Sequence, residues 1–328
     1  MPSVGRGRSA DTQGDSSSRG GRATSFNRRP RGETVSERLP SLVVSIVTYN
    51  SAREIRNCLR SLSRAAQGFD VAVHIVDNAS QDGTPEVIED LIHELSRESL
   101  RFQLARASTN LGFTRAMNLA LDGARGDAYL WLNPDVYLQE DTLATLWRVL
   151  NEDITCGIVA PQLLNPDGSI QPSCRRYPQH RDVFFEAFGL SKLLPRSRNF
   201  NAWKMGDFDH RRRAEVDQPQ GACLMIHHRA ASVVGPLDER FVMFFSDVDY
   251  CRRVQRAGFR ILFEPAARAV HEKGASVLRN RREMIRLSHR DFERYFEKWF
   301  PNRRYRAANL VTRSLLRAIL PIRLLLAR

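Results

Sequence analysis

The chain has 328 residues, a net charge of +13 at pH 7 and an isoelectric point near 10.2. This length allows one large or two ordinary domains, and the charge favours an anionic partner such as nucleic acid, a phosphorylated substrate or a membrane surface. Five cysteines without a Cys-x-x-Cys pair argue against a disulfide framework or a zinc site and indicate a reducing compartment. No apolar run reaches the roughly 18 residues of a spanning helix, and we expect no secretory signal.

Residues 1–39 are rich in serine, glycine and arginine and poor in large apolar side chains. Such a segment buries too little surface to offset the entropy of ordering, so we predict a disordered basic tail. An arm that binds nucleic acid or acidic lipid is the weaker alternative. We place the main domain at residues 40–278 and a helical, membrane-associating segment at residues 279–328.

From residue 42 onward, short apolar runs alternate with stretches of helical periodicity. The predicted strands cover residues 42–47, 71–76, 100–105 and 129–132. The segment Ser51-Ala-Arg-Glu54 fits a capping box, and Thr84-Pro85 fits an N-cap followed by proline. This alternation predicts an α/β fold with a mostly parallel sheet flanked by helices.

Polar side chains follow three of these strands, at the point where each strand ends. They are Thr48 and Asn50, Asp77 and Asn78, and Asn133 and Asp135. Because the carboxyl ends of parallel strands face the ligand crevice, we expect these groups to gather at one edge of the sheet. Asp135 beside an amide oxygen offers hard ligands to Mg²⁺ or Mn²⁺. The simpler interpretation is a set of turns, since Asn-Pro and Pro-Asp both favour turns.

The pattern changes after residue 160. Residues 175–213 are rich in arginine with little periodicity, so we predict a loop or lid over the site. A strand at 221–226 precedes a helix at 247–258, which has acids in its first turn and a glycine stop. We predict two further strands, at 260–263 and 269–271.

The C-terminal part from residue 280 is predicted to be helical. One apolar face contains Phe292, Tyr295, Phe296 and Trp299, and residues 301–328 contain seven arginines and no acid. Apolar residues alternate with these arginines, which is typical of an amphipathic helix that lies in a membrane interface on anionic lipid. The alternative is a terminal helix packed on the core.

Several motifs, in this order and spacing, make the chain resemble the GT-A glycosyltransferases of family 2, especially the bacterial rhamnosyltransferase-like branch. The resemblance spans about residues 43–271. The motifs are Val44-Ser-Ile-Val-Thr-Tyr-Asn50, Val76-Asp-Asn-Ala-Ser-Gln-Asp-Gly-Thr84, Asn110-Leu-Gly-Phe113, Leu132-Asn-Pro-Asp135, Phe244-Phe-Ser-Asp-Val-Asp249 and Val270-His271.

The resemblance implies a Rossmann-like GT-A fold with a helical basic C-terminal extension. It implies transfer of a sugar, rhamnose first among the candidates, with inversion of the anomeric centre. The donor would be dTDP-rhamnose or a UDP-sugar, and the acceptor a lipid-linked or cell-envelope glycan. The enzyme would work in the cytoplasm, peripherally on the inner face of the cell membrane.

The resemblance also implies roles for single residues. Asp247 would be the general base that takes the proton of the acceptor hydroxyl. Asp135 and His271 would hold Mg²⁺ or Mn²⁺. The donor would be bound by Thr48, Asn50, Asp77, Asn78, Arg115 and Asn133.

Two positions depart from the family pattern, and structural interpretations stay open for several others. Asn133 replaces the first acid of the metal motif, and Ser246 replaces a usual glutamate, which puts an acceptor-binding role there in doubt. Asp247 can also serve only to balance the helix dipole, and a lone histidine such as His271 is often structural. Arg115 can belong to a solvated charged surface.

Other functions fit the sequence less well. A nucleic-acid-binding protein would suit the charge, but no helix-turn-helix, zinc finger or RRM motif is visible, so no nucleic acid is expected. A nucleotidyltransferase or a dehydrogenase would need a glycine-rich phosphate loop after the first strand, where this chain has Thr48-Tyr-Asn-Ser51. A catalytically silent relative stays open, although Asp77, Asp135 and Asp247 are all present.

Overall fold

The structure is a computed structural model that describes residues 38–272 and 281–327. Residues 39–328 form one compact unit by their internal contacts. Nearly all of the tail predicted at residues 1–39, and the boundary predicted between residues 278 and 279, lie outside the described residues. That division of the chain stays a prediction.

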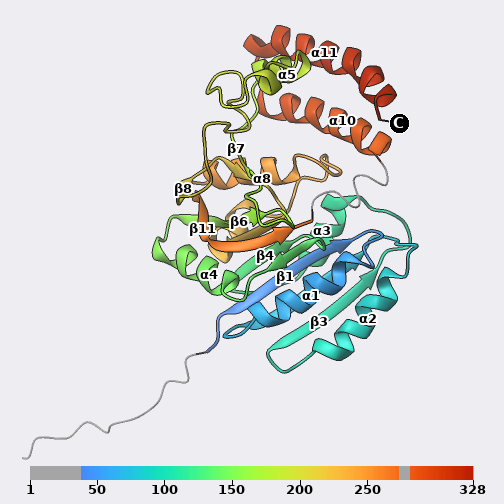
Figure 1. Cartoon of the computed structure of the whole chain (residues 1–328), viewed down its shortest axis with the longest axis vertical. Helices are drawn as coiled ribbons and strands as arrows, with labels where there is room; N and C mark the ends of the chain where they lie inside the picture. The colour runs from blue at the N-terminus through green and yellow to red at the C-terminus, as the bar shows by residue number, and fades with distance from the viewer. Residues whose placement is uncertain (1–37, 273–280, 328) are drawn as a thin grey trace, which may run out of the picture. The chain divides into compact units, whose positions relative to one another are not determined.

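A mixed sheet with a parallel half forms the centre of this unit (Figure 1). Its parallel half has the order β3-β2-β1-β4, and the strands are β1 (Ser41–Thr48), β2 (Asp70–Asp77), β3 (Leu100–Arg106) and β4 (Ala128–Leu132). The other half continues as β10-β6-β11-β5, formed by β10 (Cys223–His227), β6 (Cys156–Leu164), β11 (Arg260–His271) and β5 (Val136–Leu138). Strand β10 is antiparallel to both of its neighbours, and β11 is parallel to β6.

Helices cover both faces of the sheet, as the alternating pattern predicts. One apolar cluster joins the sheet to α1 (Glu54–Ala65), α2 (Thr84–Leu95) and α4 (Thr142–Glu152). A second cluster on the opposite face involves α3 (Phe113–Leu121), α7 (His228–Val234) and α8 (Ser246–Arg256). Fully buried side chains such as Ile46 and Leu59 each contribute about 1.5–3 kcal/mol, so these clusters hold the strand ends rigidly in place.

The predicted capping box at Ser51 is wrong. Helix α1 begins at Glu54 without a side-chain cap, and the Ser51 hydroxyl donates to the Tyr49 carbonyl (3.3 Å). The Ser51 backbone N–H donates to Thr84 Oγ1 (2.8 Å), so a residue from the start of α2 replaces the local partner. Helix α2 has the predicted proline in its first turn, but its N-cap is Gly83 and Thr84 is its first helical residue, so the predicted Thr84 cap is wrong.

Two further predictions on the second half are corrected. The strands expected at 260–263 and 269–271 are one strand, β11, with a register shift between Glu264 and Arg268. Residues 175–213 are not a structureless loop, because they contain two short helices. Those helices are α5 (His180–Ala187), which starts with a capping box between Gln179 and Asp182, and α6 (Leu190–Leu193). Segments this short leave little periodicity for a sequence pattern to show.

Three pairs of residues around this region are short strands. Strand β7 (Cys174–Arg175) pairs antiparallel with β9 (Gln218–Pro219), and β8 (Ala214–Glu215) pairs with β11. The β7–β9 ribbon therefore ties the start of the arginine-rich segment to the residues just before β10.

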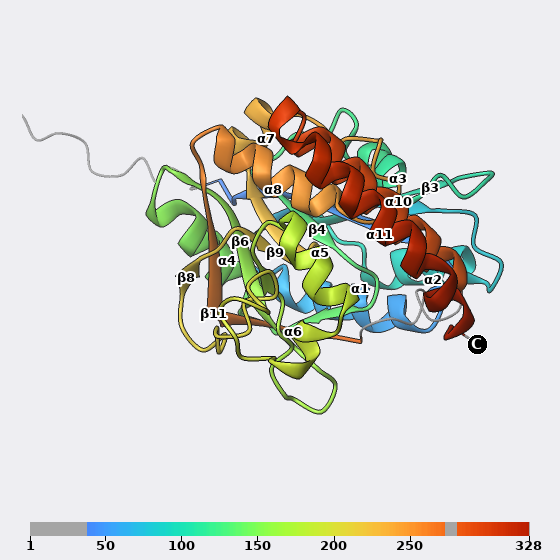
Figure 2. The ribbon, with the colours of Figure 1, turned by 90° about the horizontal axis from the view of Figure 1, so that it is seen from above.

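The C-terminal residues form α10 (Arg281–Trp299), the 3₁₀ turn Arg303–Tyr305 and α11 (Arg306–Leu325). The predicted aromatic face of α10 packs in a third apolar cluster with Phe241, Phe245 and Leu316. Helix α11 lies along α10 (Figure 2). No helix in the described part of the chain combines the length and apolarity that crossing a bilayer requires.

Candidate active site

Asp77 ties the ends of β1 and β2 together. Its carboxylate accepts hydrogen bonds from Thr48 Oγ1 (2.9 Å), from Ser80 Oγ (2.6 Å) and from the Ser80 backbone N–H (3.0 Å). The Asn50 backbone N–H donates to Ser80 Oγ (2.8 Å), and Asn50 Oδ1 accepts from the Gln81 N–H (2.7 Å). Three of the predicted donor-binding residues, Thr48, Asn50 and Asp77, therefore belong to one hydrogen-bond network.

Asn78 extends this network toward α3. Its Oδ1 accepts from the Leu111 N–H (2.7 Å), and its Nδ2 donates to the Gly112 carbonyl (3.3 Å). Gly112 has φ 79°, and a Cβ there would lie 2.7 Å from Val242 Cγ1, so a side chain would be both strained and crowded. Asn78 thus shapes the turn that starts α3.

Arg115 lies apart from these residues. Its side chain is 63% exposed and forms an ion pair with Glu239 (3.5 Å), which is the contact expected of a surface charge. The structure therefore does not join Arg115 to the network of Asp77.

Pairing between β11 and β5 brings the two predicted metal ligands together. The register places His271 opposite Val136, next to Asp135, and His271 Nε2 lies 3.5 Å from Asp135 Oδ1. Asn133 is fixed just before them by its backbone N–H, which donates to the Ala222 carbonyl (2.9 Å). Asp135 stays partly open, with 17% of its side chain exposed.

Gln171 fixes the orientation of the His271 ring, although sequence reasoning did not single it out. Gln171 Nε2 donates to the His271 carbonyl (3.2 Å) and to Asn165 Oδ1 (2.8 Å), so its Oε1 faces His271 Nδ1 at 2.7 Å. A carbonyl oxygen only accepts, which assigns a proton to Nδ1 and makes Nε2, on the side of Asp135, the nitrogen that can bind a metal. The two residues are 100 positions apart, so no local pattern could reveal the contact.

These side chains fit a divalent metal that completes its coordination with substrate. Ligand atoms at neighbouring corners of an octahedron of Mg²⁺ lie about 3 Å apart, near the separation of Asp135 Oδ1 and His271 Nε2. Among residues 38–272 and 281–327, no group of three or more metal-binding side chains is present. Two protein ligands suit Mg²⁺ or Mn²⁺, which retain water or bind substrate phosphates.

Asp247 stands in the first turn of α8 and is partly buried. Its Oδ2 accepts from the Gly221 N–H (3.0 Å) and Gln218 Nε2 (3.1 Å), and its Oδ1 accepts from the Val248 N–H (2.8 Å). A Cβ on Gly221 would lie 2.8 Å from the Asp247 Cβ, so glycine permits this approach. Burial raises the pKa of Asp247, against the opposing effects of these N–H groups and the Arg175 guanidinium.

The neighbouring Asp249 has a different environment. It is fully buried and pairs with Arg253 (2.9 Å) and Lys298 (2.5 Å), and it accepts from Trp299 Nε1 (3.0 Å). Asp249 therefore joins α8 to α10 as a structural ion pair. Asp247 is the acid of this helix whose remaining lone pair is suited to accept a proton.

Strand pairing gathers these groups at one edge of the sheet. Strands β2 and β4 flank β1 and are both parallel to it, so Thr48, Asp77 and Asn133 lie at strand ends that point the same way. Strand β10 runs antiparallel to β4 with Cys223 opposite Leu132, which places Gly221 and its partner Asp247 beside the Asn133 turn. The gathering expected from the alternating pattern is present.

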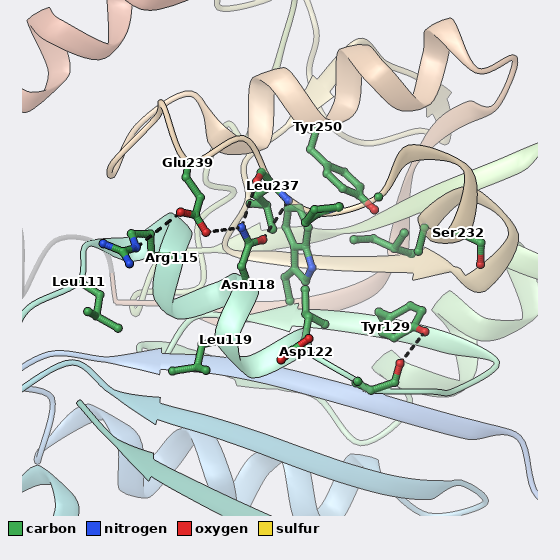
Figure 3. Close-up of a pocket in the computed structure, with 18 residues that line it drawn as sticks. Leu111, Arg115, Asn118, Leu119, Asp122, Tyr129, Ser232, Leu237, Glu239 and Tyr250 are labelled. Carbon is green, nitrogen blue, oxygen red and sulfur yellow. Dashed lines mark hydrogen bonds and ion pairs between the residues drawn. The ribbon is translucent and has the colours of Figure 1, made fainter. Parts of the chain in front are cut away.

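A cavity of about 710 Å³ lies elsewhere, between α3 and the segment that follows α7 (Figure 3). Arg115 is the one predicted site residue that lines it, and most of its wall is apolar. Asn118 at its rim already bonds to the Leu237 carbonyl (3.0 Å) and to Glu239 (3.2 Å), as Figure 3 shows. We assign the chemistry to the strand ends and not to this cavity, because the strand ends hold the other predicted site residues.

Comparisons with known proteins agree with this fold. Residues 43–201 match the family described as Glycosyl transferase family 2. The chain is 28% identical over 260 residues to an N-acetylglucosaminyl-diphospho-decaprenol L-rhamnosyltransferase of Mycobacterium tuberculosis, and the match covers 76% of this chain and 81% of that protein.

Two solved glycosyltransferase structures share the fold. Mannosyltransferase PcManGT from Pyrobaculum calidifontis, in complex with GDP-Man and Mn²⁺, matches with a TM-score of 0.53 at 19% identity, over 89% of this chain and 74% of that chain. GalNAc-T7 with UDP, GalNAc and Mn²⁺ matches with a TM-score of 0.50 at 14% identity, over 72% of this chain and 44% of that chain.

Proposed function

Because this chain carries a family 2 glycosyltransferase domain on a GT-A fold, we propose that it is an inverting sugar transferase. It moves a sugar, rhamnose first among the candidates, from a nucleotide-sugar donor to a lipid-linked glycan. The observation that carries the proposal is the position of Asp247 at the sheet edge that also holds Asp135 and His271. The similar mycobacterial protein, named as a rhamnosyltransferase for a diphospho-decaprenol acceptor, supports the choice of sugar and acceptor.

Asp247 acts as the general base. Its Oδ2 is held by two donors, while among the described residues its Oδ1 accepts from the Val248 N–H alone, so Oδ1 has a lone pair available. As the acceptor hydroxyl attacks the anomeric carbon, its proton passes to Oδ1. Attack from the face opposite the nucleotide inverts the anomeric centre.

Asp77, with Thr48 and Asn50, binds the nucleoside of the donor, and its network keeps the loop in place before the donor arrives. Asp135 and His271 would hold Mg²⁺ or Mn²⁺, and the bound ion would supply positive charge that stabilises the diphosphate leaving group. Gln171 keeps the His271 lone pair available. Asn133 contributes no charge, so metal affinity rises when the donor's diphosphate is present. Mn²⁺ in both matched structures supports a divalent ion.

Helix α11 attaches the enzyme to the membrane surface. Thr312 and Leu316 face α10, while the opposite side carries an exposed apolar stripe. That stripe contains Leu310, Val311, Ile322 and Leu325, each more than half exposed. Its spacing is helical, so one face can enter the interface while the other packs on the protein.

The arginines of α11 and of the 3₁₀ turn before it divide between two tasks. Arg313 and Arg317 pair with Glu293, and Arg313 also pairs with Glu297 of α10. These two arginines are therefore paired within the protein, so we do not expect every arginine of this region to contact lipid. Exposed Arg303, Arg304 and Arg306 attract anionic lipid and give a peripheral position on the cytoplasmic face of the membrane.

The proposed transfer is tested with purified protein, dTDP-rhamnose or a UDP-sugar, and a short-chain polyprenyl diphosphate-linked N-acetylglucosamine acceptor. We expect a product larger by one sugar, with inverted anomeric configuration, that requires Mg²⁺ or Mn²⁺ and disappears with a chelator. Nucleotide binding without transfer to any such acceptor would instead indicate a silent relative.

The membrane proposal is tested by sedimentation with vesicles of anionic phospholipid. The double variant Val311→Glu/Ile322→Glu is expected to bind at least about ten-fold more weakly, because two apolar side chains no longer enter the interface. Ile154 is exposed outside α11, so Ile154→Glu serves as the matched control and keeps wild-type binding. Equal binding by all three proteins would remove α11 from the attachment.

A further inference from the structure

The Arg175 guanidinium lacks a polar partner in the described structure. It lies over the Trp203 ring, 5.6 Å from the centroid, and within residues 38–272 and 281–327 no hydrogen bond or ion pair engages it. The side chain is partly buried, and burial lowers the pKa of this guanidinium. A guanidinium that is partly withdrawn from water and has no hydrogen-bonding partner in the protein keeps its donors available, so this position suits an anion.

The β7–β9 ribbon places Arg175 beside the candidate base. Arg175 is directly opposite Gln218 in the antiparallel register, and Gln218 Nε2 donates to Asp247 Oδ2 (3.1 Å). Directly opposite residues project on the same side of a ribbon, so Arg175 and Gln218 share one face. The position of Arg175 is therefore tied to that of Asp247 through one side chain.

Unpartnered acceptors stand next to this unpartnered donor. Gln218 Oε1 and Gln220 Oε1 are buried and have no hydrogen-bond partner among the described residues. Gln220 is held in the extension of the ribbon, where its backbone N–H donates to the Ser173 carbonyl (2.8 Å). A cation with free donors beside two amide oxygens is complementary to a phosphate group next to sugar hydroxyls.

We propose that Arg175 binds a phosphate group of a sugar diphosphate and that Gln218 and Gln220 accept hydrogen bonds from hydroxyls of the attached sugar. This rests on the proposed function, because it treats the groups around Asp247 as part of the transferase site. The phosphate belongs either to the glycosyl diphosphate of the acceptor or to the nucleoside diphosphate of the donor. Both sources offer the same chemistry to the Arg175 fork.

The test measures equilibrium binding and does not depend on turnover. Titration calorimetry gives the dissociation constants of glycosyl diphosphate, here N-acetylglucosamine diphosphate with a short prenyl tail, and of dTDP or UDP with Mg²⁺. We expect Arg175→Gln to reduce the affinity for one of these ligands about 10- to 100-fold. The adjacent, exposed Arg176 is the matched control, and Arg176→Gln is expected to stay within about two-fold of wild type.

The two ligands distinguish the two sources of phosphate. If the variant loses affinity for glycosyl diphosphate alone, Arg175 binds the phosphate of the acceptor. If it loses affinity for nucleoside diphosphate alone, Arg175 binds the phosphate of the donor. Equal affinities of the Arg175→Gln and Arg176→Gln proteins for both ligands would overturn the proposal. A wild-type protein that binds these ligands but transfers no sugar would overturn the proposed function and leave the phosphate site standing.

Two further variants test the proposal by other substitutions. Should Arg175→Gln fail to fold, Arg175→Lys carries the test, because it keeps the charge and loses the two-pronged donor; unchanged affinity for both ligands would then overturn the proposal. Gln220→Leu is expected to weaken, several-fold, the binding of the sugar diphosphate that depends on Arg175, which is either the glycosyl diphosphate or the nucleotide sugar, and to leave the affinity for inorganic pyrophosphate unchanged. Equal weakening of both would overturn the assignment of Gln220 to a sugar hydroxyl.

Discussion

The loop after β2 and the ribbon beside α8 differ in how their polar groups are partnered. Around Asp77, the carboxylate has three donors and each neighbouring hydroxyl has a defined partner. Around Asp247, the Arg175 guanidinium and the Oε1 atoms of Gln218 and Gln220 have no partner in the described residues. The first region is complete without a ligand, whereas the second has polar groups that a ligand can satisfy. This difference separates a preorganised support from a recognition surface.

Among the variants around Asp247, Asp247→Asn is expected to have the largest effect. The amide is almost isosteric but cannot take the acceptor proton, so kcat should fall about 10²- to 10⁴-fold. Affinity for the nucleoside diphosphate should change little, because Asp77 and the metal ligands are untouched. Steady-state kinetics and calorimetry on the same preparation check both halves. Normal turnover in this variant would remove Asp247 from the base role.

Asp77→Asn should disrupt the hydrogen-bond network around Asp77. The new Nδ2 group would face the Ser80 N–H or hydroxyl, so donors that Asp77 satisfies lose their acceptor. We expect a loss of about 2 kcal/mol in the free energy of unfolding, together with weaker nucleotide binding. Denaturant unfolding measures the first, and calorimetry measures the second. Unchanged stability would show that this network contributes less than its geometry indicates.

Gln171→Ala tests whether support from a distant residue matters at the metal ligands. Losing the partner of His271 Nδ1 frees the ring to change tautomer and orientation, so Mn²⁺ should bind about 10- to 100-fold more weakly in the presence of nucleoside diphosphate. Electron paramagnetic resonance of free Mn²⁺ gives the affinity directly. Wild-type affinity would place the metal away from His271.

The acid limb of the pH–rate profile gives the smallest and most specific effect. Burial raises the pKa of Asp247, and a base must be deprotonated, so kcat should fall as the pH drops through a value above the usual carboxyl range. The Arg175 cation opposes this rise. Arg175→Gln should therefore move the acid limb to higher pH, by up to about one unit, whatever its effect on the rate. An acid limb at the same pH in both proteins would show that the Arg175 charge does not affect the pKa of Asp247.

Sequence pattern was sufficient where a function depends on a strand end or a helix start. Parallel strands put their carboxyl ends on one edge, so the positions of Asp77 and Asp135 followed from periodicity and turn residues. The same holds for the placement of Asp247 at the start of α8. His271 was also singled out, although through the resemblance and not from its own surroundings.

Several features could not be predicted, because their partners are distant in the chain. The Ser51 N–H donates to Thr84 and not to the expected local partner, and Gln171 fixes the orientation of the His271 ring. Asp249 became a structural ion pair with Lys298, which separates its role from that of Asp247 two positions earlier. Each of these contacts depends on how elements pack, which local periodicity does not encode.

The amino-acid sequence by itself determined the α/β class, the strand ends that carry Asp77 and Asp135, and the basic amphipathic C-terminus, because these depend on short-range periodicity and composition. Only the tertiary structure decided that Arg175 lies beside Asp247, and that α11 packs one face on α10 and exposes another. The physical reason is that an irregular segment such as 175–213 takes its conformation from the surfaces it covers, and those surfaces exist only in the folded chain.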